Sequence, residues 1–172
     1  MNKKKLFISN LCWKHRDFKK IIKLIKKNNI KGIDIAPIQL RNNWTKIDIK
    51  LKKFAKELNK LNIKVNAIQG IFYKKNFNLF ESNNFQKKKI YEHIRKILTI
   101  SKIFKCNKVI IGSSSFRDLG NLTKREADFT FVSFFKQIKP LLAKKKIYLC
   151  FETIPKNYGE NYLYKISHLV QL

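Results

Sequence analysis

Residues 146–159 read KIYLCFETIPKNYG, and the rest of the chain is organised around this stretch. Ile147 to Phe151 is a near-continuous apolar run of β-prone residues, which predicts a strand buried on both faces. The run ends on an acid, Glu152, and Pro155 disfavours direct continuation of a regular element. A carboxylate at the carboxyl end of a buried parallel strand lies where α/β enzymes keep their reacting groups. Glu152 is therefore a candidate catalytic residue, and a simply solvated strand-end glutamate is the alternative.

Four similar units precede this strand. Strands are predicted at 5–11, 32–36, 63–68 and 108–111, and amphipathic helices at 17–27, 47–61, 85–104, from 123 onward and from 161 to 172. Asp17 is a plausible N-cap of the first helix, and Thr123 and Glu126 have the spacing of a capping box. Strands that alternate with helices predict right-handed crossovers and a parallel sheet, in a single domain over residues 1–172.

Such a sheet either stays open or closes into a (β/α) barrel. No GxGxxG or GxxxxGK[ST] pattern follows any predicted strand, which argues against the common nucleotide-binding open sheets. A complete barrel of eight units needs about 250 residues. The 172 residues carry five predicted strands, so we expect an α/β fold of the parallel TIM-barrel type, with about five of the eight βα units.

The formal net charge of +28 suggests contact with phosphate groups. However, Lys, Asn, Ile and Phe are all abundant, and their codons are rich in A and T, so mutational bias accounts for the lysines as well. The lysines are spread over every predicted helix instead of forming one tract. We therefore expect no specific nucleic-acid partner, although the charge attracts anions nonspecifically.

Composition also bears on location. No apolar run reaches the length of a membrane span, and the basic N-terminal stretch lacks the apolar length and cleavage site of a signal peptide. The three cysteines are an odd number without a CxxC, which predicts neither a disulfide framework nor a zinc ribbon. A reducing cytoplasm and no membrane partner are the expectation.

Polar residues follow the predicted strands, and in a barrel they would converge on one mouth. Beside Glu152, the candidate substrate-binding residues are Asn10, His15, Asp34, Gln69, Ser113 and Arg117. Asp34 lies between apolar neighbours, so it must face the mouth or a hydrogen-bond donor. We expect Asp34 and Glu152 to project from neighbouring parallel strands towards one polar mouth. Ser113 and Arg117 fit a phosphate or sugar hydroxyls, and an ordinary polar loop is the alternative. His93 and His168 lie on predicted helices and are interpreted as surface or packing residues.

Five segments together resemble the sugar phosphate isomerase/epimerase family, the xylose isomerase-like TIM barrels. They are ISNLCW at 8–13, GIDIAP at 32–37, NAIQGIFY at 66–73, VIIGSSSFRD at 109–118 and LCFETIPKNYG at 149–159. The resemblance implies a divalent metal ion, Mn²⁺ first and Zn²⁺ or Mg²⁺ as options, with Glu152 as its first ligand. Asp34 stands where family members more often carry Glu, and the ligands that the family places on later strands have no counterpart.

The implied chemistry is isomerisation or epimerisation of a sugar or sugar phosphate through an enediolate, with Glu152 as a proton-transfer group. Five strands with one such carboxylate predict a chain that is inactive by itself and that self-associates through its open sheet edge. Two other functions stay open. One is an endonuclease IV-like phosphodiesterase acting on DNA, which the charge favours, and the other is a non-catalytic product.

Overall fold

The computed structural model describes residues 6–40, 44 and 48–172. Its strands are β1 (Phe7–Ser9), β2 (Gly32–Ile35), β3 (Lys64–Ile68), β4 (Lys108–Ile111) and β5 (Tyr148–Phe151). Its helices are α1 (Phe18–Lys27), α2 (Asp48–Lys60), α3 (Asn84–Ile103), α4 (Lys124–Lys145) and α5 (Ile166–Gln171). All strand pairs are parallel, in the order β1-β2-β3-β4-β5. Sequence neighbours are thus sheet neighbours, as in the front part of a (β/α) barrel.

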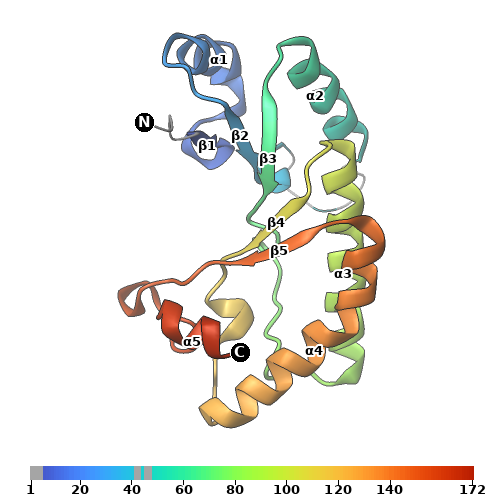
Figure 1. The fold of residues 1–172 in the computed structure, drawn as a ribbon, viewed down its shortest axis with the longest axis vertical. Coiled ribbons are helices and arrows are strands. Elements are labelled where there is room, and N and C mark those ends of the chain that lie inside the picture. Colours follow the sequence, from blue (N-terminus) through green and yellow to red (C-terminus); the bar gives the residue numbers. More distant parts are fainter. Residues whose placement is uncertain (1–5, 41–43, 45–47) are drawn as a thin grey trace.

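The sheet twists strongly between β1 and β5, and α2, α3 and α4 lie along one side of it (Figure 1). Alternation along the strands separates two faces. Ile33 and Ile35 of β2, and Val109 and Ile111 of β4, point to the helices and are fully buried or nearly so. The residues between them point to the opposite, inner face, which in a closed barrel is the interior.

The core lies between the sheet and its helices. On the long helix α3, Ile90, Ile94, Ile97 and Leu98 have no exposed surface, which follows from their helical spacing. Among the described residues, no helix is both long enough and apolar enough to cross a membrane.

Local signals fix most element boundaries. The capping box of Thr123 and Glu126 is confirmed, because each side chain binds the backbone N–H of the other. Asp17 is the N-cap residue of α1, as predicted, but it also ends a short 3-10 turn and its side chain makes no capping hydrogen bond. The predicted first residue of the strand at 5–11 and that of the helix at 47–61 lie outside the described residues.

The last helix begins five residues later than predicted, at Ile166. The N–H groups of Tyr162 and Leu163 donate to the carboxylate of Glu160, 3.1 Å away in each case. This local side-chain acceptor offers the backbone an alternative to helix, and residues 161–165 form bends and irregular backbone instead.

Candidate functional site at the carboxyl ends of the strands

Glu152 projects from the inner face of the sheet, immediately after β5. Its N–H donates to the carbonyl of Ile111 at 3.0 Å, which extends the ladder between β4 and β5 by one residue. The preceding ring, Phe151, packs on Phe131 of α4 with ring centroids 5.0 Å apart. Because side chains alternate along an extended chain, Glu152 takes the face away from the helices, and it is exposed there.

The carboxylate of Glu152 lies across the end of β4. A Cβ atom added to Gly112 would stand 2.1 Å from Oε2 of Glu152 and 3.2 Å from its Cβ. The place that a side chain would occupy on β4 is thus taken by the acid from β5. A residue without a side chain at this point allows the carboxylate to lie close to the backbone.

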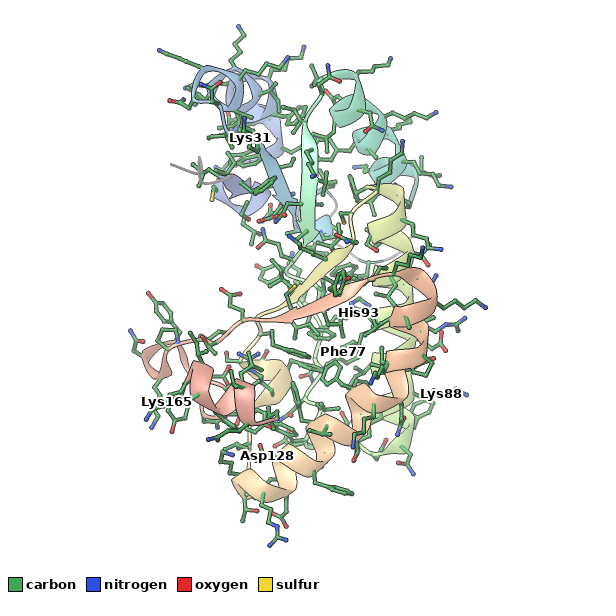
Figure 2. All side chains as sticks on the ribbon, viewed as in Figure 1. Lys31, Phe77, Lys88, His93, Asp128 and Lys165 are labelled. Carbon is green, nitrogen blue, oxygen red and sulfur yellow. The ribbon has the colours of Figure 1, made fainter. Side chains whose placement is uncertain are left out.

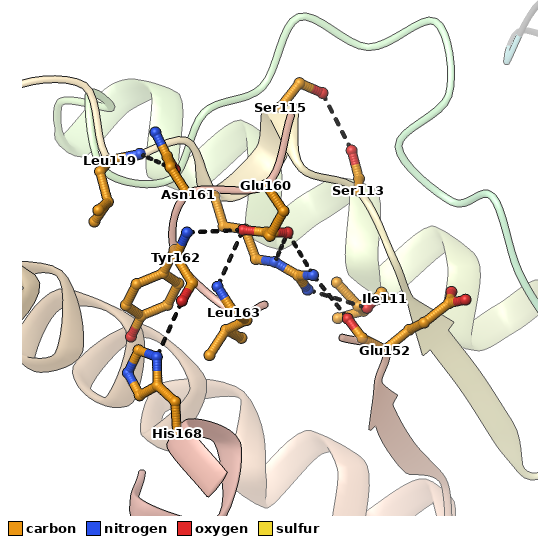
Figure 3. Close-up of polar contacts among 11 residues, drawn as sticks. Ile111, Ser113, Ser115, Leu119, Glu152, Glu160, Asn161, Tyr162, Leu163 and His168 are labelled. Atoms are coloured by element: carbon orange, nitrogen blue, oxygen red, sulfur yellow. Dashed lines mark hydrogen bonds and ion pairs between the residues drawn. The ribbon is translucent and has the colours of Figure 1, made fainter. Parts of the chain in front are cut away.

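Arg117 is fully buried and does not face the mouth. Its Nε donates to Oε2 of Glu160 at 2.7 Å, and its Nη2 lies 2.7 Å from the same oxygen. Its Nη2 also donates to the backbone carbonyl of Glu152 at 2.7 Å, and Nη1 donates to that of Ile111 at 3.4 Å (Figure 3). The guanidinium is shielded from solvent and already has four acceptor contacts, so the structure places it away from the mouth, and the expected role of Arg117 as a substrate contact stays a prediction.

Glu160 is the residue of this site that sequence reasoning missed. Its side chain is 2% exposed and balances the charge of Arg117. No local pattern marks it, since its partner is 43 residues away along the chain. Its Oε1 accepts the N–H groups that follow it, so one carboxylate ties the loop after β5 to Arg117.

Asn10 fixes the ends of β1 and β2 to each other. Its side-chain amide accepts the N–H of Ala36 at 2.6 Å and donates to the carbonyl of the same residue at 3.2 Å. Asn10 is 3% exposed, so its amide supports the backbone of the mouth and presents little surface to a ligand. That Asn10 binds substrate directly stays a prediction.

Gln69 and Ser9 meet at the carboxyl end of β2, which lies between their own strands. The side-chain amide of Gln69 donates to the hydroxyl of Ser9, and its backbone N–H donates to Ile35 at 2.8 Å. Both side chains are half-buried. Gln69 therefore remains a polar group at the mouth, and Ser9 is an addition that the sequence reasoning did not single out.

Asp34 lies apart from Glu152, because β3 and β4 stand between their strands. Its Oδ1 accepts a hydrogen bond from Asn66 at 2.8 Å, and Asn66 in turn accepts one from Lys108 at 3.2 Å. The expectation that Asp34 and Glu152 project from neighbouring strands is wrong. Asp34 has instead the donor that its apolar surroundings require, in a polar row across the inner face of β2, β3 and β4.

His15 and Ser113 complete the predicted set. The exposed ring of His15 packs against Phe18 and Phe54, with centroids 6.2 and 5.6 Å away, and so lies between α1 and α2. Ser113 lies beside the mouth, directly after Gly112, and its hydroxyl is 3.2 Å from that of Ser115 (Figure 3). Of His15 and Ser113, only Ser113 lies near Glu152.

The two helix histidines are packing residues, as predicted. His93 is buried beside the ring of Trp44, and its Nε2 lies 2.6 Å from the carbonyl of Ile71. The pKa of His93 is lowered to about 4, mainly by burial, since the charged form loses its hydration, and to a smaller extent by the charges of Lys75 and Lys96. His168 lies between the carbonyl of Tyr162 and Asp128.

Within the described part of the chain, no three His, Cys, Asp or Glu side chains come close enough together to hold a metal ion. A divalent cation in a protein takes about four ligands or more. Glu152 alone therefore does not fit the metal site that the family resemblance implies.

The fold is shared with several solved structures. A xylose isomerase-like TIM barrel/4-hydroxyphenylpyruvate dioxygenase fusion protein matches 97% of this chain with a TM-score of 0.72 and 9% identity, over 24% of its own length. D-psicose 3-epimerase from Clostridium cellulolyticum H10, solved with D-tagatose, matches 97% of the chain with a TM-score of 0.69 and 15% identity. An AP endonuclease of family 2 from Brucella melitensis matches 92% with a TM-score of 0.66 and 14% identity.

The chain spans 59% of the length of both the epimerase and the endonuclease. No family model and no curated protein matches the sequence. At these identities the likeness establishes the fold, and the activity has to be argued from the residues.

Proposed function

We propose that this chain, which has the fold of the xylose isomerase-like TIM barrels, belongs to an isomerase or epimerase acting on a sugar or sugar phosphate. The observation that carries the proposal is the exposed carboxylate of Glu152 at the carboxyl end of β5, lying over Gly112. TIM-barrel enzymes place their reacting groups at this end of the sheet. The similarity to D-psicose 3-epimerase supports the same reaction class.

The proposed role of Glu152 is proton transfer. Isomerising or epimerising a sugar requires removal of a proton from the carbon next to a carbonyl, and a positioned carboxylate performs this step as general base. Among the predicted residues, Gln69 and Ser113 are polar side chains at the mouth that we propose to bind sugar hydroxyls. His15 faces Phe18 and Phe54 instead, so we place it outside the substrate contacts.

An enediolate would need a positive charge near its oxygens, and a divalent metal ion, if bound at the mouth, would supply it. The described residues bring Glu152 to the mouth, but they assemble no group of three His, Cys, Asp or Glu side chains that could hold a metal ion. We therefore propose that residues 1–172 alone are inactive and hold no divalent ion tightly, which equilibrium dialysis with Mn²⁺ and Zn²⁺ would check.

The test uses the product of the complete reading frame that contains these residues. It is incubated in D₂O with ketohexoses and their phosphates, and NMR follows deuterium incorporation next to the carbonyl. Glu152→Gln should abolish the exchange. Glu92→Gln is the matched control, because Glu92 lies on α3 in an exposed pair with Arg95 and should leave the rate unchanged. Exchange that persists in Glu152→Gln would refute the proposal.

A DNA phosphodiesterase is not favoured, although one similar structure is an AP endonuclease. Basic side chains such as Lys31, Lys88 and Lys165 point outward from widely separated parts of the molecule (Figure 2). Such scatter supports nonspecific attraction more than a groove for duplex DNA. We expect weak DNA binding with a steep salt dependence, and tight binding near physiological salt would reverse this preference.

A further inference from the structure

Burying the ion pair of Arg117 and Glu160 costs free energy, and a gain in the stability of the fold does not account for its presence. Both side chains are removed from water, with 0% and 2% exposure. Taking two charges out of water is unfavourable, and apolar residues of similar volume often replace such a pair without loss of stability. A different benefit is therefore expected from the contacts that the pair makes.

Those contacts converge on the main chain of Glu152. Its N–H donates to Ile111 at 3.0 Å, and its carbonyl accepts Nη2 of Arg117 at 2.7 Å. The same guanidinium donates to the carbonyl of Ile111. Both peptide groups that flank the Cα atom of Glu152 are thus held, and the direction of its Cα–Cβ bond is fixed.

Glu160 in turn holds the guanidinium. Its carboxylate accepts Nε of Arg117 with one oxygen and two backbone N–H groups with the other. A charge-assisted contact of this kind restricts the orientation of the planar guanidinium. Without Glu160, Arg117 would keep its charge but lose the partner that aims it at β5.

We infer that Arg117 and Glu160 are positioning residues, which aim the carboxylate of Glu152 across Gly112 at the mouth. The inference rests on the function proposed above for Glu152. Arg117 touches only the backbone of Glu152, so the pair acts through that residue and does not reach the substrate.

The inference is tested on the 172-residue chain by NMR, without any sugar. In the wild type, a nuclear Overhauser cross-peak should join the side chain of Glu152 to the Hα atoms of Gly112, since these groups are in contact. The double variant Arg117→Met/Glu160→Met replaces the pair with apolar side chains. It should lose this cross-peak while keeping the contact between Phe131 and Phe151, which reports the intact sheet and helix layers.

Asn161→Ala is the matched control. Asn161 joins the same two loops, because it accepts the N–H of Leu119 at 3.0 Å and donates to Asp118 at 2.8 Å, and these side-chain hydrogen bonds do not involve Arg117. The Glu152–Gly112 cross-peak should survive in this variant. Its loss there, or its survival in the double variant, would overturn the inference.

If the double variant does not fold, Arg117→Lys takes its place. A single ammonium group does not reproduce the guanidinium's separate contacts with Glu160 and with the carbonyl of Glu152, so the cross-peak should again be lost. A retained cross-peak in Arg117→Lys would overturn the inference. These results do not depend on the exchange assay. Loss of the cross-peak together with unaffected exchange in Glu152→Gln would refute the proposed function and leave the positioning role standing.

Discussion

Oε2 of Glu152 occupies the space that a side chain at Gly112 would fill, with 2.1 Å between that oxygen and a Cβ placed on the glycine. The two residues stand side by side because Ile111 pairs with Phe151 in the register of β4 and β5. The position of the proposed catalytic acid therefore depends on the pairing of β5 with β4 and on the absence of a side chain at Gly112.

Gly112→Ala is expected to move the Glu152 carboxylate without unfolding the chain. The added methyl group meets the flexible end of an exposed side chain, so the free energy of unfolding should change by less than about 0.5 kcal/mol. The exchange rate of the full-length product should fall, because the carboxylate is displaced. Urea denaturation and the D₂O assay measure the two effects. Equal activity in Gly112→Ala and wild type would show that this placement of the acid is unimportant.

Single substitutions of the buried pair should destabilise strongly. Glu160→Met leaves the guanidinium of Arg117 buried without its carboxylate, and breaking such a pair costs about 3–5 kcal/mol. The double replacement by methionine should cost much less, because no unpaired charge remains. Urea denaturation of the wild type, Arg117→Met, Glu160→Met and the double variant gives the free energies of unfolding for a double-mutant cycle. Additive losses would show that the two residues do not act as a pair.

Stability should fall as the pH is lowered from about 6.5 towards 4. The pKa of His93 is lowered to about 4 by burial, whereas the unfolded chain takes up a proton near the ordinary value of 6.5. Between these values the unfolded state binds more protons, so the free energy of unfolding rises with pH and is fully regained above 6.5. The shift from 6.5 to about 4 corresponds to about 3 kcal/mol. Urea midpoints at several pH values measure it.

His93→Gln is the control for this pH dependence. Its amide can donate to the carbonyl of Ile71, as the neutral imidazole does, but it does not titrate. The variant should lose less stability than the wild type between pH 7 and pH 4.5, values taken on either side of the ordinary pKa of about 6.5. Parallel pH curves for both proteins would assign the effect to other groups.

The 172-residue chain should self-associate along β5. Among the described residues, this strand pairs only with β4, so one of its edges is open. An apolar groove of about 480 Å³ between α4 and the C-terminal residues adjoins it, lined in part by Phe135 and Leu169. Tyr148, on β5, is 67% exposed. An unpaired edge beside apolar surface favours association with another chain.

Tyr148→Lys should shift the chain towards monomer, because a lysine on an edge strand opposes pairing. Tyr73→Lys, at a similarly exposed tyrosine in the loop after β3, should not. Sedimentation velocity over a range of concentrations compares the three proteins. A wild type that stays monomeric throughout would contradict the prediction.

The sequence by itself determined the order and nature of the elements. Each strand and helix carries its own periodicity within a few residues, and the capping box at Thr123 and Glu126 depends on neighbours three positions apart. Such signals are local, so they are readable without the fold. The placement of Glu152 at a strand end was predictable for the same reason.

Only the tertiary structure decided what surrounds Glu152. Asp34 seemed a companion by its place in the sequence, but two strands separate it from Glu152 and it binds Asn66 instead. Arg117 and Glu160, 43 residues apart, meet because two loops pack together where water is excluded. The partner of a buried charge is set by the packing of distant segments, and no pattern in either segment alone specifies it.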